Sequence, residues 1–218
     1  MAKKKKVTNL QMMTWYMEYV TEHGKKPDSA AKFAEIYNFD ASVFNAYYDS
    51  FKELEQVIFR TLFDASVETV IMSDEYSVFN KKDKLLSIYY TFFENLSLNR
   101  DYVVFILNDY GLSLKTLSVL SQLKESYVTY VEELDLQDLG LNFDLIEPIQ
   151  KISIRESSWV QLLFTLKFWL EDSSPDFEKT DVFIEKSINT SIDLIDTKAL
   201  NNIIDLGKFL YKEKFQSK

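Results

Sequence analysis

The sequence predicts an all-α protein, with three short helices at its N-terminal end and a bundle of longer helices after them. Apolar residues recur every three or four positions along most of the chain, which is the spacing of one face of a helix. Only 4 Gly and 3 Pro occur among 218 residues. So few chain-breaking residues favour long helices over many short strands joined by turns. Hydrophobic residues make up 46 % of the chain, which is enough to fill a substantial core.

Composition excludes several classes of site. The chain has no Cys, which excludes disulfides and thiolate metal ligands, and its one histidine, His23, cannot build an imidazole metal cage or a serine-hydrolase relay. No glycine-rich phosphate loop is present. We therefore expect no catalytic residues, no metal and no cofactor. No apolar run approaches the roughly 20 residues needed to span a bilayer, and the segment after the basic N-terminus is too polar for a signal peptide, so we expect a cytoplasmic protein without a membrane span.

The first fifty residues carry clear helix start and stop signals. The apolar spacing predicts three short helices, which cover residues 8–23, 29–37 and 40–47. Gly24 is a natural stop for the first helix, and Ser29 can cap the second by accepting a bond from a free backbone N–H. Either Asp40 or Ser42 can cap the third helix. The Asn38-Phe39 pair between the second and third helices predicts a tight turn.

A long fourth helix is predicted over 51–72. Its expected inner stripe consists of Leu54, Ile58, Leu62 and Ala65, broadened by Val57 and Phe59. Further helices are predicted over 82–98, 100–110, 113–134, 145–152, 156–170, 176–195 and 198–215. Residues 136–144 are expected to form a loop. We place the domain boundary between residues 53 and 54, with an N-terminal domain over 1–53 and a C-terminal helical domain over 54–218.

Three helices in about fifty residues, with a four-residue turn between the second and third, are typical of a helix-turn-helix. The net charge of -9 is unevenly distributed. Residues 1–53 carry eight Lys or Arg and seven Asp or Glu, whereas the remainder carries seventeen and twenty-seven. Affinity for DNA depends on the charge of the docking face rather than on the sum over the chain, so this distribution permits DNA binding.

The segment 27–55 resembles the helix-turn-helix of the TetR family of bacterial transcriptional regulators. The resemblance rests on the cap Ser29, the apolar-Ala pair Phe33-Ala34, the turn Asn38-Phe39-Asp40, and the elements Phe44-Asn45-Ala46-Tyr47-Tyr48 and Ser50-Phe51-Lys52-Glu53-Leu54. Asn38 stands where the family usually has Gly, and Asn is among the few residues that accept a left-handed backbone. The resemblance implies a dimeric regulator, a repressor in type, whose C-terminal helical bundle binds a ligand and pairs the subunits.

In that interpretation the third helix enters the major groove of double-stranded DNA. Asn45 could bond adenine, Val43 or Ala46 could contact a thymine methyl, and Tyr47 and Lys52 could contact the backbone. The predicted DNA-binding residues are Lys3, Lys4, Lys5, Lys6, Ser29, Ser42, Val43, Asn45, Ala46, Tyr47 and Lys52. Two alternatives stay open: the lysine run Lys3–Lys6 is either an arm that reaches DNA or a solvated tail, and Val43 either contacts DNA or packs inward.

Aromatic residues of the C-terminal domain suggest a cavity for a small lipophilic effector, although such residues also fill ordinary cores. The predicted lining residues are Tyr89, Tyr127, Tyr130, Trp159 and Phe168. Two apolar stripes near the C-terminus suggest a homodimer built from two helices per subunit, which implies a palindromic operator; the alternative is that both stripes pack within one chain. The predicted interface residues are Leu162, Leu166, Trp169, Phe177, Ile184, Ile188 and Ile195.

A second function is also consistent with the sequence. A protein of this fold could bind lipids or other proteins and have lost DNA binding, as has the TetR-like lipid-binding protein of mitochondrial coenzyme Q biosynthesis. The third helix contains no arginine, so it cannot make bidentate arginine contacts to guanine, and this alternative stays open.

Overall fold

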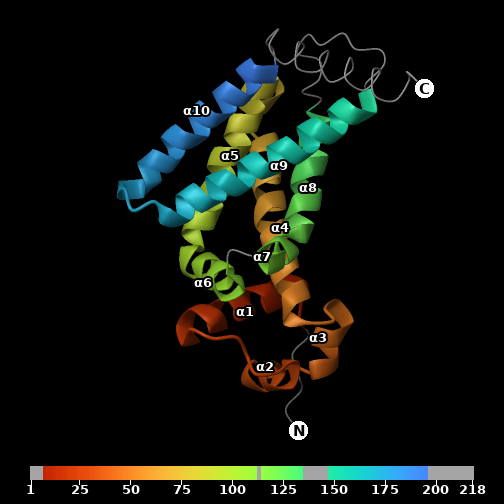
Figure 1. Cartoon of the computed structure of the whole chain (residues 1–218). Helices are drawn as coiled ribbons and strands as arrows, with labels where there is room; N and C mark the ends of the chain where they lie inside the picture. Colours follow the sequence, from red (N-terminus) through yellow and green to blue (C-terminus); the bar gives the residue numbers. More distant parts are fainter. Residues whose placement is uncertain (1–6, 112–113, 135–146, 196–218) are drawn as a thin grey trace, which may run out of the picture. The chain divides into compact units, whose positions relative to one another are not determined.

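The computed structural model describes residues 7–111, 114–134 and 147–195 (Figure 1). Within these ranges the chain forms ten α-helices and two short 3-10 helices, and no strand. The all-α prediction is therefore confirmed. None of the helices in the described ranges is long and apolar enough to cross a membrane.

The three N-terminal helices lie where the sequence places them. They are α1 (Asn9–His23), α2 (Ala30–Ile36) and α3 (Ala41–Tyr47). Gly24 ends α1 in the left-handed region at φ 59°, where its missing Cβ removes the steric penalty. The Ser29 side chain caps α2 by accepting a bond from the Lys32 N–H, and of the two cap candidates for α3 the structure selects Asp40.

Helix α4 (Phe51–Ile71) has the predicted length, but its buried face is rotated from the predicted stripe. The buried residues are Leu54, Glu55, Ile58, Phe59, Phe63, Ser66 and Val70. Leu62 is only half-buried and Ala65 is exposed, so these two predictions are wrong. The apolar pattern misplaces the face because two polar residues, Glu55 and Ser66, point inward and find polar partners there.

The later helices are α5 (Lys81–Leu98), α6 (Arg100–Tyr110), α7 (Leu114–Val119), α8 (Ser121–Glu133), α9 (Glu147–Glu171) and α10 (Glu178–Ile195), with 3-10 helices η1 (Asp74–Ser77) and η3 (Pro175–Phe177). The helix predicted over 113–134 is broken at Leu120, where consecutive Val119 and Leu120 are both buried. The helices predicted over 145–152 and 156–170 form one continuous helix, α9. The predictions for 136–144 and 198–215 lie outside the described residues.

The chain divides into two compact units. The first unit consists of residues 1–72 and 91–127 and contains α1–α4, α6 and α7. The second consists of residues 73–90 and 128–218 and contains α9 and α10. Helices α5 and α8 contribute residues to both units. Aromatic side chains fill the core of the first unit, whereas Trp169, Ile184 and Ile188 are fully buried in the second. The boundary predicted at residue 53 separates a DNA-binding domain from an effector domain, which is a functional division, and it stays a prediction.

Candidate functional site

Aromatic packing holds α2 and α3 against each other. The ring of Phe33, buried on α2, meets Phe44 of α3 edge-on, with 6.3 Å between ring centroids, and Phe39 of the turn at 5.6 Å. Asn38 occupies the turn at φ 55°, in the left-handed region, and the Phe39 N–H bonds the Ala34 carbonyl at 3.0 Å. These contacts make the two helices and their turn a single crossed pair, as a helix-turn-helix requires.

The outer face of α3 is exposed and uncharged. Phe44 points inward, whereas Ser42, Asn45, Ala46 and Tyr47 are exposed and Val43 is half-buried. No charged residue occurs between the cap Asp40 and Asp49. Of the other predicted DNA-binding residues, Lys52 is exposed, Ser29 is exposed with its hydroxyl engaged as the α2 cap, and Lys3–Lys6 lie outside the described residues. The face can therefore offer an amide, hydroxyls and methyl groups to another surface.

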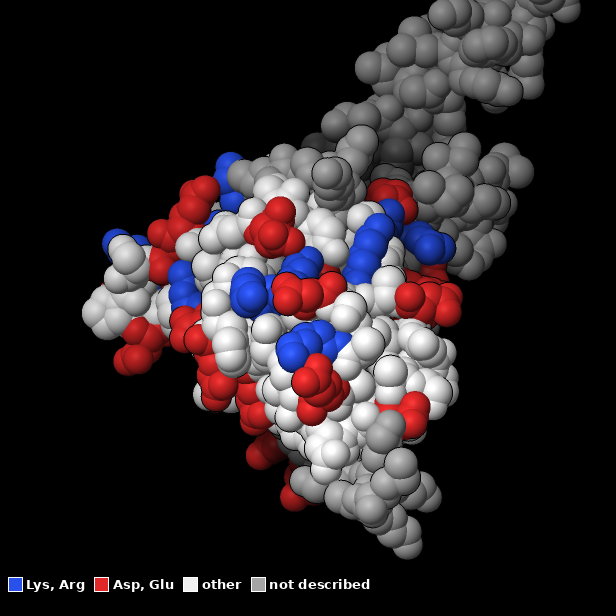
Figure 2. Space-filling model, turned by 90° about the horizontal axis from the view of Figure 1, so that it is seen from below, with Lys and Arg blue, Asp and Glu red and all other residues white. Residues whose placement is uncertain are grey.

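Three of the four lysines within residues 7–53 have carboxylate partners. Lys25 lies 3.9 Å from Asp28, and Lys32 lies 2.9 Å from Glu35 on the same helix. Figure 2, which views the molecule from below Figure 1, shows basic and acidic side chains interleaved rather than a continuous basic patch. Exposed ion pairs of this kind contribute little stability, but they do reduce the positive charge available to phosphates.

A buried charge cluster connects α1, α4, α6 and the loop before α2. Its centre is Glu55 of α4, whose side chain is 0 % exposed. The Tyr16 hydroxyl donates to Glu55 Oε1 at 2.5 Å, and the Tyr110 hydroxyl donates to Oε2 at 2.7 Å. The Lys26 ammonium lies 2.9 Å from Glu55 Oε1 and 2.9 Å from Asp109 Oδ2. A charge buried this deeply is tolerated only when paired and hydrogen-bonded, and here both conditions are met.

The electrostatics of the cluster agree with its geometry. Burial raises the pKa of Tyr110 to about 12, assisted by its hydrogen bond to Glu55. Burial and the charge of Glu55 likewise raise the pKa of Tyr16. Burial lowers the pKa of Lys26, but the bonds to Glu55 and Asp109 outweigh it and leave that pKa raised. Lys26 also lies 4.3 Å from the centroid of the Tyr110 ring, an additional cation–π contact.

Sequence reasoning missed this cluster. The available signal was an acidic residue, Glu55, directly beside Leu54 in an apolar stripe; its partners lie 29 to 55 positions away and follow no local pattern. Tyr102 of α6 belongs to the same region. Its hydroxyl is buried and has no hydrogen-bond partner among the described residues, and burial together with the charge of Glu55 raises its pKa.

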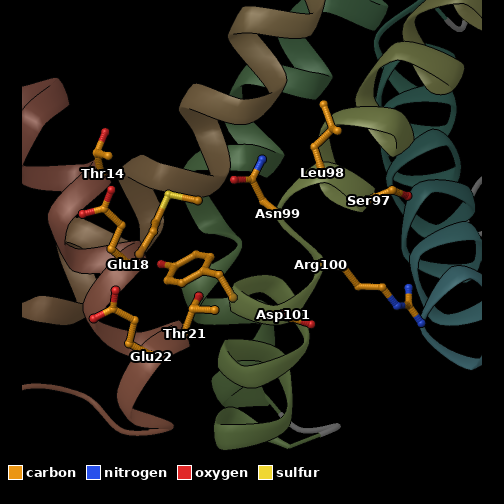
Figure 3. A pocket seen from close by; sticks show the side chains of 11 residues that line it. Thr14, Glu18, Thr21, Glu22, Ser97, Leu98, Asn99, Arg100 and Asp101 are labelled. Atoms are coloured by element: carbon orange, nitrogen blue, oxygen red, sulfur yellow. The ribbon is translucent and has the colours of Figure 1, made fainter.

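A cavity of about 600 Å³ lies between α1 and the junction of α5 with α6. Figure 3 shows Thr14, Glu18, Thr21 and Glu22 of α1 on one side and residues 97–101 on the other. Its charged lining residues are Glu18, Glu22, Asp101 and Arg100. This polar, net-acidic lining differs from the apolar cavity that the sequence predicted, and none of the predicted effector residues contributes to it.

Residues 84–210, more than half of the chain, match the family model described as "Tetracyclin repressor-like, C-terminal domain". The chain belongs to the TetR family. None of the curated proteins matches this sequence. The family match covers the C-terminal part, for which the sequence offered only a resemblance in architecture, and it confirms the resemblance that was inferred from residues 27–55.

The aromatic residues predicted to line the effector site of this TetR-family chain belong to both compact units. Tyr127 is buried in the first unit, where its ring meets Phe63 edge-on at 5.7 Å. Tyr89, Tyr130 and Trp159 are buried in the second unit, and the Tyr130 hydroxyl lies 3.2 Å from that of Tyr76. Phe168 is half-buried and lines a groove of about 410 Å³ on α9 and α10. Their role in effector binding stays a prediction.

Most of the residues predicted at the dimer interface lie inside the TetR-family monomer. Leu162, Leu166, Trp169, Ile184 and Ile188 are all at most 6 % exposed. Phe177 is half-buried against Trp169, at 6.0 Å between ring centroids, and the side chain of Ile195 lies outside those described. A second subunit would therefore find little of this stripe to contact.

A neighbouring face of the same two helices is apolar and exposed. Phe164 of α9 is 62 % exposed, Val160 45 % and Val182 of α10 47 %. Beside them, Phe168 stacks on Phe183 with 4.6 Å between ring centroids. We call these five residues the α9–α10 apolar face. Sequence periodicity predicted pairing through these two helices, but most of the residues that it named are buried within one chain.

Proposed function

We propose that this TetR-family chain is a DNA-binding transcriptional regulator, a repressor in type, rather than an enzyme. The observation that carries the proposal is the exposed, uncharged outer face of α3 on a crossed helix pair fixed by Phe33 and Phe44. In a helix-turn-helix, the second helix of such a pair enters the major groove of double-stranded DNA.

The residues of α3 suit recognition by hydrogen bonds and methyl contacts. Asn45 can pair with an adenine edge, Ser42 can bond either a base or a phosphate, and Ala46 can contact a thymine methyl. Tyr47 at the end of α3 and Lys52 at the start of α4 are both exposed, and we propose that they contact the phosphate backbone. The half-buried Val43 has less surface to offer, which favours a packing role for it.

Phosphate attraction must come largely from the N-terminal arm. Residues 7–53 contain four lysines and seven acidic residues, and three of those lysines are paired with carboxylates. The run Lys3–Lys6 adds four positive charges, which doubles the number of cations in the module. We therefore infer that these lysines act as an arm on DNA rather than as a solvated tail.

The C-terminal helical domain is proposed to pair two subunits and to bind a small lipophilic effector. For pairing we assign the α9–α10 apolar face, because large apolar side chains left exposed on two packed helices favour contact with another protein surface. Two paired chains would present two α3 helices to a palindromic operator in the cytoplasm. For the effector, the aromatic side chains of the second unit supply the apolar lining that lipophilic ligands need.

A helical binding protein without DNA affinity is the second candidate. The pairing of Lys25, Lys26 and Lys32 with carboxylates favours it, since such a surface attracts phosphates weakly. Both candidates share the fold and differ only in whether DNA binds.

A salt series on DNA affinity distinguishes the candidates. The full chain is titrated against the DNA upstream of its own gene and against a selected random library, from low to physiological salt, by fluorescence anisotropy. Specific binding should weaken with salt, and replacing Lys3–Lys6 by alanine should reduce the slope of log K against log[salt] by up to roughly 3 to 4, at about 0.9 for each lost phosphate contact. Asn45→Ala should weaken binding to the selected site only. Absence of DNA binding even at low salt would leave the second candidate.

A further inference from the structure

We propose that Lys26 is a latch: a single positioning residue that ties the loop leading into α2 to the last turn of α6, so that movement of that turn repositions the helix-turn-helix. The inference rests on the proposed function, because only a DNA-binding chain would translate the position of Lys26 into a change in DNA affinity. Its structural basis is independent of DNA and can be tested without it.

The bonding of Lys26 is unusual for a lysine in a short loop. Its ammonium bridges carboxylates on two different helices, Glu55 of α4 and Asp109 of α6, at 2.9 Å each. The side chain is only 25 % exposed. Tyr110, the last residue of α6, contacts both members of the Lys26–Glu55 pair: the centroid of its ring lies 4.3 Å from the ammonium, and its hydroxyl donates to Glu55. The end of α6 therefore supplies Asp109 and Tyr110 together to one cation.

The loop transmits the position of Lys26 to α2. Lys26 precedes Pro27, which is buried, and a residue before proline is restricted to extended conformations. Ser29, two residues after Pro27, caps α2. Its hydroxyl accepts a hydrogen bond from the Lys32 N–H, and its carbonyl accepts one from the Phe33 N–H. Because Phe33 packs on Phe44 of α3, a shift of Lys26 moves α2 and α3 as a pair. Gly24, which ends α1, lies on the other side of Lys26 in the chain.

Glu55 makes the latch responsive to α6 in particular. Its other tyrosine bond comes from the Tyr16 hydroxyl of α1, whose ring in turn meets Tyr102 near the start of α6 edge-on at 6.3 Å, far from the last turn. When the last turn of α6 withdraws, Glu55 loses the Tyr110 hydroxyl and Lys26 loses Asp109. The Lys26–Glu55 pair then has no contact from the last turn of α6, and the loop that carries Lys26 can move more easily. Exposed ion pairs elsewhere in the module, such as Lys25 with Asp28, have no such connection.

The test measures hydrogen exchange at the Lys32 and Phe33 amides in the full chain. Lys26→Met should raise exchange there by about tenfold, and Lys26→Arg should restore most of the protection. On the α6 side, Tyr110→Phe and Asp109→Asn should raise exchange at the same amides of α2, although neither residue touches them. Lys25→Met is the matched control in the loop. Asp101→Asn, about two turns earlier on α6, is the control for the change in charge.

Operator affinity is the second readout. Asp109→Asn should change the affinity more than Asp101→Asn does, although both remove one negative charge. A purely structural role for the cluster predicts a different pattern: lower thermal stability with exchange at Lys32 and Phe33 within twofold of the Lys25→Met control. That pattern in both Lys26→Met and Tyr110→Phe would overturn the latch. If the wild-type chain binds no DNA, the proposed function fails, while the exchange experiment still decides the latch.

Discussion

The buried Lys26–Glu55 pair gives a sharp prediction for stability. Replacing Lys26 by methionine keeps a side chain of similar length and removes only the cation. Glu55, whose side chain is 0 % exposed, would then keep two tyrosine hydroxyls but no positive partner. Breaking a buried pair from one side costs about 3–5 kcal/mol. Because Lys26 itself is 25 % exposed, we expect the lower end, about 3 kcal/mol.

For a chain of 218 residues this loss corresponds to a decrease in Tm of roughly 6–12 °C, at about 2–4 °C per kcal/mol. The measurements are thermal unfolding by circular dichroism and urea titration at neutral pH. Lys25→Met is the matched control, since its exposed partner Asp28 is 3.9 Å away and the pair should contribute less than about 1 kcal/mol.

A double substitution tests the physical cause. Glu55→Gln removes the negative charge and keeps a polar partner for each tyrosine: its carbonyl oxygen can accept from one hydroxyl, and its amide N–H can donate to the oxygen of the other. Lys26→Met with Glu55→Gln should therefore be more stable than Lys26→Met alone by at least about 1 kcal/mol. Equal stability of Lys26→Met and Lys25→Met, or strictly additive effects in the double variant, would refute the reasoning that an unpaired buried charge dominates.

Three further predictions concern other parts of the chain. At Asn38, φ 55°, glycine should be tolerated while alanine lowers the free energy of unfolding by about 1 kcal/mol, and the reverse order in urea titrations would contradict the turn geometry. Asp172 accepts hydrogen bonds from Ser174 and Thr180, which outweigh the effect of burial and lower its pKa from 3.8 to about 2. The stability that this carboxylate contributes is therefore present above pH 3.8 and lost as the pH falls towards 2. Asp172→Asn should flatten the dependence of Tm on pH in that window, and an unchanged slope would count against this assignment. On the α9–α10 apolar face, Phe164→Glu should convert a dimer to a monomer in light scattering while Lys167→Glu on the same helix does not; a dimer that survives Phe164→Glu pairs elsewhere.

The sequence alone determined the helical order of the N-terminal module. Caps and stops are local: Ser29, Asp40 and Gly24 satisfy backbone groups within a few residues of themselves, so their types indicate helix ends before any tertiary contact forms. The turn at Asn38 is likewise local, because it depends on the backbone conformation of one residue. The exposure of residues 45–47, between the buried Phe44 and Tyr48, also agrees with the residue types.

Only the tertiary structure decided which face of each longer helix is buried. On α4 the apolar pattern favoured Leu62 and Ala65, yet Glu55 is the residue that turns inward, because Lys26, Tyr16 and Tyr110 converge on it from distant segments. On α9 and α10 apolar residues occupy more than one side, and periodicity cannot tell which side the chain covers itself. The physical reason is the same in both places. Whether a side chain is buried depends on what it contacts in the folded chain, and the partners that permit a buried charge such as Glu55 lie too far away in the sequence for local spacing to record them.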